Sequence, residues 1–386
     1  MTEGLAALMA KGDLLAELAG LIGPGGVRKA LGDPHSRRRP RPCGLTVHVG
    51  RGCPNACLYC YVGDIVGPGP AEPRPTPLSG PEMAYALLSN PYFVPGRMGT
   101  FLALGAVCDP FHPSLIGRTL EIMGSVARFL GNPTQFSTKM PLGPDLIGRL
   151  PDGLSISPLV TVVTLRRAGE LEPRAPSPWE RLEAIRVLRK RGLKPMLFLR
   201  PLIPSLEGEL EEILDEARAH GAVGVVVGAL RVSRNILRRL GKVGLDKPVL
   251  ARLRKRPPSG RLVPVPMPDL KEEAMRLARE KGLLAFKSAC CANAFTAGVP
   301  CASLCWIRGF CSSCPNRCWE KLPDVEEELV AEALWRAFGL RARCVMVEDG
   351  RLIVEVGRSP GLEKKVGPAR RALEVATRRR LDLRVV

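Results

Sequence analysis

Continuous runs of apolar residues alternate with amphipathic segments over the first two thirds of the chain. The apolar runs do not alternate with polar residues, which is typical of strands that are covered on both faces. Between them, apolar residues recur at helical spacing, with Ser or Pro at several starts and Gly at several ends. The expected strands are 45–49, 100–107, 134–139, 157–165, 194–203 and 222–230, and the expected helices are 81–90, 113–130, 143–150, 177–192 and 207–221.

This regular order of strand and helix favours an α/β fold with a parallel sheet. We expect a partial barrel of the TIM type, with a (β/α)6 core, followed by a further helix at 269–281. The last segment predicts helix, strand, an Asp349–Gly350 turn, strand, helix and strand. The expected domains are an N-terminal helix (4–21) with a basic arm over 1–42, the barrel with a basic extension over 43–285, a Cys-rich segment over 286–322, and a small basic α+β module over 323–386.

Composition narrows the setting in which the protein acts. No apolar run is long enough to span a bilayer, and the N-terminus lacks the basic start and apolar centre of a signal peptide, so we expect a cytoplasmic protein. The 13 cysteines are clustered, which in the cytosol favours metal or redox sites over disulfides. Abundant Arg and a single Gln, Gln135, suggest a thermophile, and some thermophiles do form intracellular disulfides.

The chain is strongly basic, with a net charge of +19 and a pI near 9.8. Basic residues gather at 35–42, 251–261 and 370–380. Such clusters attract phosphate backbones, so a nucleic acid is the expected partner. The alternative is that the charge serves solubility or reflects thermophilic Arg usage.

Three cysteines lie within eight residues of "VGRGCPNACLYCYVG" (49–63), at Cys53, Cys57 and Cys60. A closed zinc site needs four ligands, and the next cysteine, Cys108, is far along the chain. His48 is a candidate fourth ligand or a core residue. Three thiolates suit a [4Fe–4S] cluster in which one iron keeps an open position. The alternatives are structural zinc and inert buried thiols.

The Cys-x3-Cys-x2-Cys spacing after the first barrel strand resembles the signature of the radical S-adenosylmethionine (SAM) enzymes. In that family the open iron binds SAM, and reductive cleavage gives a 5′-deoxyadenosyl radical that abstracts a hydrogen from the substrate. Over about residues 43–240 the chain is similar to the group that contains spore photoproduct lyase. The matching motifs are "GRGCPNACLYCY", "LGAVCDPFHP", "STKM" and "LEPRAPSPWERLEAIRVLRKRGLKPMLFLRPLIPSL".

The resemblance implies roles for single residues. It assigns Cys53, Cys57 and Cys60 to the cluster, and it matches Asp109 and Lys139 to positions that contact SAM. The alternatives are that Asp109 caps a helix and that Lys139 is a solvated surface charge. Further candidates around the cofactor are Thr161 and Thr164, for a ribose hydroxyl, and Arg200, at the barrel mouth or in a buried ion pair.

Tyr59 and Tyr61 flank Cys60. The resemblance links tyrosines at these positions to radical transfer, together with a hydrogen-donor cysteine on the second strand. Here that position is Ala106, and Cys108 follows two residues later. Cys108 is therefore a candidate substitute donor or a packing residue, and repair of spore DNA is not carried over to this chain.

Seven cysteines form a second group between residues 290 and 318, which includes "CSSCPNRC". This spacing fits an auxiliary iron–sulfur cluster or a structural zinc, since spacing alone does not select the metal. The alternatives are buried thiols and thermophilic disulfides. The group contains Cys290 and Cys291, and its candidate metal ligands are Cys301, Cys305, Cys311, Cys314 and Cys318.

The C-terminal module resembles the last half of a KH-type RNA-binding module, although a clear GXXG loop is missing. A dimerisation or lid domain is the alternative. The expected function is radical SAM chemistry on a nucleic acid, in repair or base modification, with a low-potential electron donor such as ferredoxin or flavodoxin. The alternatives are the same chemistry on a peptide or small metabolite, and a non-enzymatic zinc-ribbon protein that binds nucleic acid.

Overall fold

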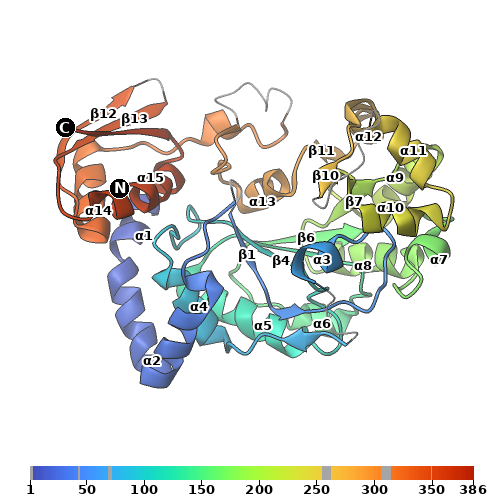
Figure 1. The fold of residues 1–386 in the computed structure, drawn as a ribbon, viewed down its shortest axis with the longest axis horizontal. Helices are drawn as coiled ribbons and strands as arrows, with labels where there is room; N and C mark the ends of the chain where they lie inside the picture. Colours follow the sequence, from blue (N-terminus) through green and yellow to red (C-terminus); the bar gives the residue numbers. More distant parts are fainter. Residues whose placement is uncertain (1–2, 42–43, 68–71, 254–261, 306–313, 349) are drawn as a thin grey trace.

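The structure is a computed structural model of the chain, and it describes residues 3–41, 44–67, 72–253, 262–305, 314–348 and 350–386. Its centre is a parallel sheet curved into a partial barrel (Figure 1). The strand order β1-β4-β5-β6-β7-β8-β11 follows the sequence, which confirms the expected fold class. The strands of this sheet are β1 Leu45–Val47, β4 Leu102–Leu104, β5 Thr134–Thr138, β6 Ile156–Thr161, β7 Met196–Leu202, β8 Gly224–Ala229 and β11 Leu284–Phe286.

Helices cover the outer face of this sheet, as the amphipathic segments predict. Two of them start with a capping box, in which Ser79 pairs with Glu82 and Ser177 pairs with Glu180. The helices on this face are α4 Gly80–Ser89, α5 Ile116–Ser125, α6 Pro144–Gly148, α8 Pro178–Lys190, α9 Leu210–Ala219 and α12 Pro268–Glu280. Four further helices belong to segments that follow strands: α3 Val62–Val66, α7 Ala168–Leu171, α10 Arg234–Gly241 and α11 Asp246–Arg252. Short antiparallel pairs join β2 Gly50–Arg51 to β3 Arg74–Pro75, and β9 Arg231–Val232 to β10 Val263–Pro264.

Two expectations about the elements are corrected. The expected six strands become seven in the described chain, because β11 adds to the edge of the sheet beside β8. The N-terminal helix does not end near residue 21. It forms α1 Glu3–Met9 and then α2 Lys11–Gly32, which bends at Gly23, where φ is 66°. Pro24 follows this bend at the start of a new helical turn, a position that tolerates the missing N–H group.

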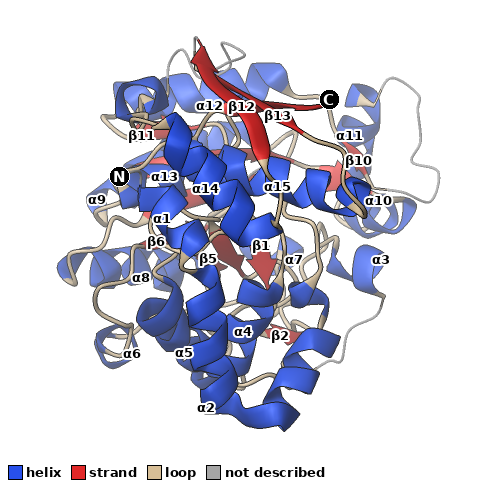
Figure 2. Ribbon diagram, turned by 90° about the vertical axis from the view of Figure 1, so that its left-hand side faces the viewer, coloured by secondary structure: helices blue, strands red, loops and turns tan. Residues whose placement is uncertain are grey.

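The C-terminal module has the expected order of elements: α14 Glu327–Phe338, β12 Ala342–Glu348, β13 Arg351–Val356, α15 Leu362–Thr377 and β14 Arg380–Val385. Its sheet has the order β12-β13-β14, and Asp349 of the expected turn lies outside the described residues. Leu5 and Leu8 of α1 pack into the core of this module. Both ends of the chain therefore lie in one lobe beside the barrel, as Figures 1 and 2 show.

One helix, α13 Ala289–Ala297, enters the end of the barrel at which the strands begin. The side-chain amide of Gln135 donates to the carbonyl oxygen of Ala289 at 2.8 Å, and that of Asn293 donates to Leu102 and Pro133 at 3.5 and 3.3 Å. Leu102 begins β4, and Pro133 precedes β5. In the described chain, no helix has the length and apolar character that crossing a bilayer requires.

Candidate metal and cofactor site at the mouth of the barrel

The cysteine triplet lies on the loop that leaves the barrel after β1 and β2, at the carboxyl ends of the strands. The loop turns at Gly52 and Ala56, where φ is 104° and 52°. The amide of Cys60 donates to the carbonyl oxygen of Cys57 at 3.0 Å, which closes the second turn. Active sites of parallel barrels lie on loops at this end, so the position of the triplet suits chemistry.

An arginine from a distant helix holds this loop. Arg239 of α10 donates from Nε to the carbonyl oxygen of Leu58 at 2.9 Å, and from Nη2 to that of Cys60 at 2.6 Å. The same guanidinium lies 3.4 Å from the carboxylate of Asp64. Nothing in the sequence singles out Arg239, because a contact over about 180 residues of chain leaves no local signal.

The three thiols lie close enough to interact electrostatically with one another and with Lys139. Burial raises the pKa of the Cys53 thiol to about 11 and that of the Cys57 thiol to about 12. Buried thiols become thiolates readily only when a cation compensates their charge. The loop therefore suits a cationic metal centre whose binding releases protons.

Asp109 follows β4, and its buried carboxylate accepts three hydrogen bonds from neighbouring residues. It accepts hydrogen bonds from the amides of Phe111 at 3.1 Å and Lys139 at 2.7 Å, and from the hydroxyl of Thr138 at 2.7 Å. Burial raises the pKa of Asp109, against these three hydrogen bonds, which lower it. The carboxylate ties the end of β4 to the end of β5 and positions Lys139. The alternative role of a helix cap is wrong, because the next helix, α5, begins at Ile116 and has Leu115 at its N-cap.

Lys139 faces the interior of the site, so the alternative of a solvated surface charge is wrong. Its side chain is only 15% exposed, and its Nζ lies 3.7 Å from Glu172 and 5.5 Å from the centre of the Tyr59 ring. Burial acts to lower the pKa of Lys139, but Glu172 and Cys57 raise it, and the net direction is upward. A protonated amine beside the triplet suits an anionic group of a ligand.

Glu172 is a buried hub, a role that its sequence motif does not indicate. Its carboxylate accepts a hydrogen bond from the Tyr59 hydroxyl, and it pairs with Arg181 at 2.5 Å and with Lys139. Burial, and then the charge of Glu172, raises the pKa of Tyr59 well above its usual value. Arg181 also donates to the carbonyl oxygen of Thr161 at 3.3 Å. This network fixes Tyr59 as a neutral, hydrogen-bonded residue beneath the cysteine loop.

Tyr61 and Cys108 lie at the same mouth. The Tyr61 hydroxyl donates at 3.3 Å to the carbonyl oxygen of Ala106, the position that the resemblance matches to a hydrogen-donor cysteine. Cys108 is buried beside Cys53 and Asp109. Burial, and then the charge of Asp109, raises the pKa of its thiol to about 12, so this thiol stays protonated.

Arg200 is exposed in the barrel mouth, so the alternative of a buried ion pair is wrong for it. Its guanidinium lies 5.9 Å from the ring of Phe198 and acts electrostatically on Tyr61. Its stem lies against Gly228 of β8. A Cβ atom at Gly228 would come within 2.5 Å of Arg200 Cδ, so glycine leaves the space that this stem occupies.

The two threonines differ. Thr161 is buried at the end of β6, next to Arg181. The Thr164 hydroxyl donates to the carboxylate of Glu209 at 2.9 Å and accepts from the amide of Arg167 at 3.1 Å. Because both functions of this hydroxyl are used inside the protein, the geometry does not favour a ribose contact through Thr164.

His48 contacts other residues than the cysteines. Its ring centre lies 5.5 Å from that of His35, and its backbone amide donates to His35 Nε2 at 3.1 Å. Burial, followed by the charges of Arg38 and His35, lowers the pKa of His48 to about 4.

The second cysteine group lies by α13, at the opposite end of the barrel from the triplet. Cys290, Cys291, Cys301 and Cys318 are buried there. Cys305 Sγ lies 4.0 Å from the carbonyl oxygen of Ser303, and Cys311 is outside the described residues. Among the described residues, no three His, Cys, Asp or Glu side chains already surround a position for a metal ion.

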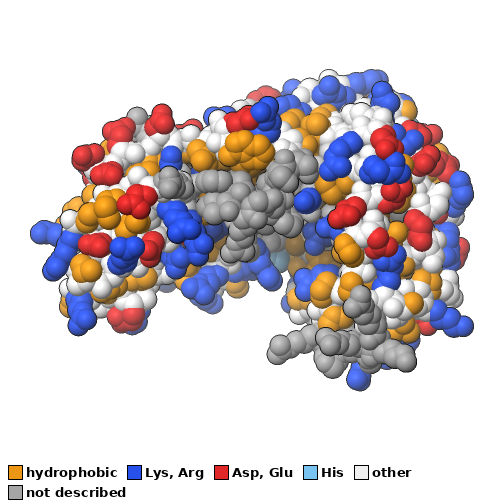
Figure 3. Space-filling model, turned by 90° about the horizontal axis from the view of Figure 1, so that it is seen from above, with side chains coloured by type: hydrophobic (Ala, Val, Ile, Leu, Met, Phe, Trp, Pro, Cys, Tyr) orange, Lys and Arg blue, Asp and Glu red, His pale blue; other side chains and the backbone are white. Residues whose placement is uncertain are grey.

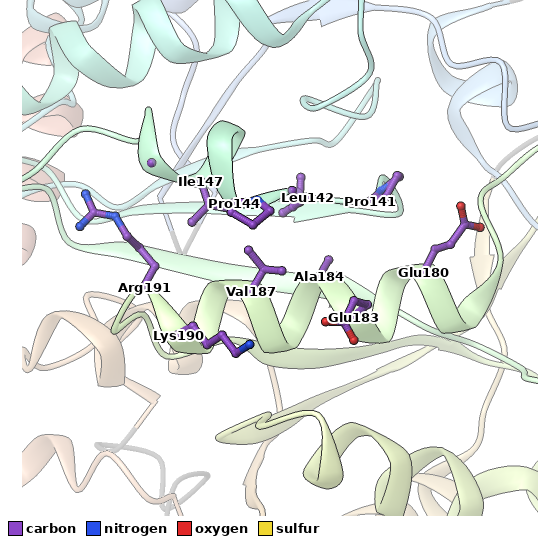
Figure 4. Close-up of a pocket in the computed structure, with 12 residues that line it drawn as sticks. Pro141, Leu142, Pro144, Ile147, Glu180, Glu183, Ala184, Val187, Lys190 and Arg191 are labelled. Carbon is purple, nitrogen blue, oxygen red and sulfur yellow. The ribbon is translucent and has the colours of Figure 1, made fainter.

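A separate cavity of about 570 Å³ lies outside the sheet, between α6 and α8 (Figure 4). Its lining includes Leu142, Ile147 and Val187, with Glu180 and Arg191 at its edges. None of the candidate site residues lines it.

Comparisons with known proteins find distant similarities. No protein-family profile matches the chain. An uncharacterised protein, ORF301 of Acidianus two-tailed virus, is 25% identical over 211 residues, which cover 50% of this chain and 65% of that protein, slightly under two thirds of its length.

Among solved structures, a mutant of spore photoproduct lyase is similar, with a TM-score of 0.49, 19% identity, and 63% of this chain and 76% of that chain covered. Another mutant of this lyase, with bound AdoMet and dinucleoside spore photoproduct, has a TM-score of 0.47 and 19% identity over 61% of this chain and 72% of that chain. The radical SAM methyltransferase TsrM of Kitasatospora setae has a TM-score of 0.36 and 15% identity over 51% of this chain and 40% of that chain. These are distant likenesses of fold, so the functional conclusions below rest on the residues of the chain itself.

Proposed function

We propose that the chain is a radical SAM enzyme and that Cys53, Cys57 and Cys60 hold its [4Fe–4S] cluster. The observation that carries this proposal is the three-cysteine loop at the carboxyl ends of a parallel barrel, beside the buried ammonium group of Lys139. When bound and reduced, the cluster supplies the electron that cleaves SAM to a 5′-deoxyadenosyl radical.

The chain's own residues hold and shield this chemistry. Arg239 fixes the cysteine loop through two backbone carbonyls. Lys139, held by Glu172, offers a positive charge to the carboxylate of SAM. Asp109 joins the ends of β4 and β5, so its role is to position Lys139. Buried Thr161 remains a candidate for the ribose.

Tyr61 and Cys108 are the candidates for handling a substrate radical. The Cys108 thiol stays protonated in its buried site, and only a protonated thiol can donate a hydrogen atom. Tyr59 is less suited to this step, because its hydroxyl is bound to Glu172. Arg200 is exposed at the mouth, where it suits an anionic group of the substrate.

For the substrate we propose a nucleic acid, modified or repaired at a base. The net charge of +19 supports this choice. Figure 3 shows a hollow between the C-terminal lobe and the barrel lobe, with Lys and Arg side chains along its sides. A low-potential donor such as ferredoxin or flavodoxin would supply the electron, and we expect the reaction to take place in the cytoplasm.

The chemistry is tested by anaerobic reconstitution with iron and sulfide, followed by dithionite and SAM. Wild-type protein should form 5′-deoxyadenosine, and the triple variant Cys53→Ala/Cys57→Ala/Cys60→Ala should not. Wild-type rates from the triple variant would end the proposal.

The substrate class is tested separately, by binding of tRNA and duplex DNA at several salt concentrations and by mass spectrometry of nucleosides after turnover. Affinity for a nucleic acid that falls steeply with salt, together with an altered nucleoside, supports the proposed substrate. Cleavage of SAM without either result would favour a peptide or small metabolite.

A further inference from the structure

The thiols of the second cysteine group contact one another at the base of the barrel. The Cys291 thiol is within hydrogen-bonding reach of the thiols of Cys290 and Cys314, and the Cys301 thiol is within reach of Cys290. The sulfur of Cys318 accepts the amide of Cys301 at 3.3 Å and the side-chain amide of Asn316 at 3.1 Å. Five cysteines from three separate stretches of chain therefore converge in one apolar environment.

Two features of this environment stabilise negative sulfur. Cys290 and Cys291 occupy the first turn of α13, where the helix dipole favours thiolates, and the Ser288 hydroxyl lies 2.8 Å from Cys290 Sγ and 3.6 Å from Cys291 Sγ. The two N–H groups directed at Cys318 also favour sulfur as an acceptor. Metal-binding thiolates are commonly supported by such outer hydrogen bonds.

A buried cation, Arg378, gives separate evidence for negative charge on these cysteines. Arg378 has no exposed surface, and its guanidinium donates only to carbonyl oxygens: those of Pro300 at 2.9 Å, Gly99 at 3.2 Å, and Val375. Among the described residues no carboxylate forms an ion pair with it. The thiols of Cys301 and Cys318 lie close enough to act on it electrostatically, and the more distant carboxylate of Glu3 acts on it less. A buried guanidinium without a paired anion is costly, and neutral thiols or disulfides would not offset its charge.

A metal centre with four thiolates would offset it. Four thiolates around Zn²⁺ or around a [4Fe–4S]²⁺ core carry a net charge of about −2. Four thiol protons would leave to solvent, and metal–sulfur bonds of about 2.3 Å for zinc would replace the present thiol–thiol contacts.

We propose that four of the five residues Cys290, Cys291, Cys301, Cys314 and Cys318 bind a second metal centre, with Arg378 as its buried counter-charge. The centre joins α13, inside the barrel, to the C-terminal module, because Arg378 follows α15 of that module. It lies at the end of the barrel remote from Cys53, so it does not touch the cofactor at the mouth. The proposal differs from the sequence-based ligand set by including Cys290 and Cys291, and it is independent of the proposed radical chemistry.

The test uses the full chain with the triple substitution Cys53→Ala/Cys57→Ala/Cys60→Ala, purified without oxygen, so that only the second group can hold metal. Elemental and acid-labile sulfide analysis should find roughly one zinc, or roughly four iron with sulfide, per chain. Zinc identifies a structural zinc site and iron with sulfide an auxiliary cluster, and both support the proposal. Absence of bound metal, or a mass deficit that shows disulfides among these cysteines, overturns it.

Variants then assign the ligands. Adding Cys291→Ser and Cys301→Ser should reduce bound metal to background, whereas adding Cys344→Ser, on β12 and outside both groups, should leave it unchanged. If the Ser variants do not fold, alkylation of the thiols in the triple variant shows whether these cysteines bind the metal. A chelator should expose four of the five thiols to alkylation together, while the reactivity of Cys344 does not change. Metal release without any change in these thiols would contradict the proposal.

Discussion

Removing the charge of Glu172 tests whether the buried hub beneath the cysteine loop is what holds the site together. The carboxylate and the guanidinium of Arg181 are both completely buried, and they lie 2.5 Å apart. The change Glu172→Gln keeps the size of the side chain and an acceptor for the Tyr59 hydroxyl. It leaves Arg181 and Lys139 without their common negative partner.

Breaking a buried ion pair from one side costs about 3–5 kcal/mol, because the remaining charge is desolvated without compensation. Typical stabilities are about 5–15 kcal/mol, so the loss is a large share. We expect Glu172→Gln to lower the free energy of unfolding by about that amount, measured by denaturant titration of the metal-free chain without oxygen. The Tyr59 hydrogen bond contributes little to this difference, since the amide oxygen can still accept it.

A matched control lies two residues away. Glu170 pairs with Arg167 on the surface, where solvent screens the pair, so Glu170→Gln should leave stability nearly unchanged. The double variant Glu172→Gln/Arg181→Met removes both buried charges and should recover part of the loss. Equal stability of Glu172→Gln and wild type would refute the hub, and an additive double variant would refute the coupling.

Three further changes probe neighbouring features. Lys139→Met removes a charge-assisted contact worth about 1.5–3 kcal/mol, so SAM should bind roughly 10–100-fold more weakly to the reconstituted protein. The control Lys190→Met, on the exposed face of α8, should bind SAM normally. Equal affinities of the two variants would exclude Lys139 as a contact of SAM. Arg239→Gln removes the contacts to the carbonyl oxygens of the cysteine loop, so a chelator should remove iron roughly tenfold faster than from wild type. The control Arg238→Gln, on the exposed face of α10, should lose iron at the wild-type rate. Identical rates for the two variants would show that the carbonyl contacts are dispensable. The pKa of His48 is lowered from 6.5 to about 4 in the folded protein, so the unfolded chain binds the proton first and stability falls as pH drops from 6.5 to 4. His48→Leu should reduce this loss of stability by roughly 1–3 kcal/mol. An unchanged dependence of stability on pH would contradict the lowered pKa of His48.

The sequence predicts the barrel well, because buried parallel strands leave continuous apolar runs and the helices between them have clear start signals. It misses β11, whose three residues sit in the run "LLAFKSACC", where a short strand and the start of α13 cannot be separated by periodicity. It also ends the N-terminal helix too early, because Gly23–Pro24 is typical of a helix end, yet the chain only bends there.

The sequence likewise predicts some residues of the candidate site and not others. Cysteines on the first loop and polar residues after successive strands must meet, since the carboxyl ends of parallel strands share one edge. Contacts made across the fold leave no such trace. Tyr59 and Glu172 are 113 residues apart, and Thr164 binds a carboxylate on the segment before α9. Only the packed structure shows which polar groups are already satisfied and which face a ligand.

The central claim is that the triplet loop holds a cluster with an iron open to SAM, and electron paramagnetic resonance tests it most directly. The reconstituted chain, reduced with dithionite, is measured with and without SAM, beside the Cys53→Ala/Cys57→Ala/Cys60→Ala variant. We predict a [4Fe–4S]⁺ signal from wild type whose shape changes when SAM is added, and no SAM-dependent signal from the variant. A wild-type cluster signal that SAM leaves unchanged, or a triplet that binds zinc instead of iron, would contradict the account.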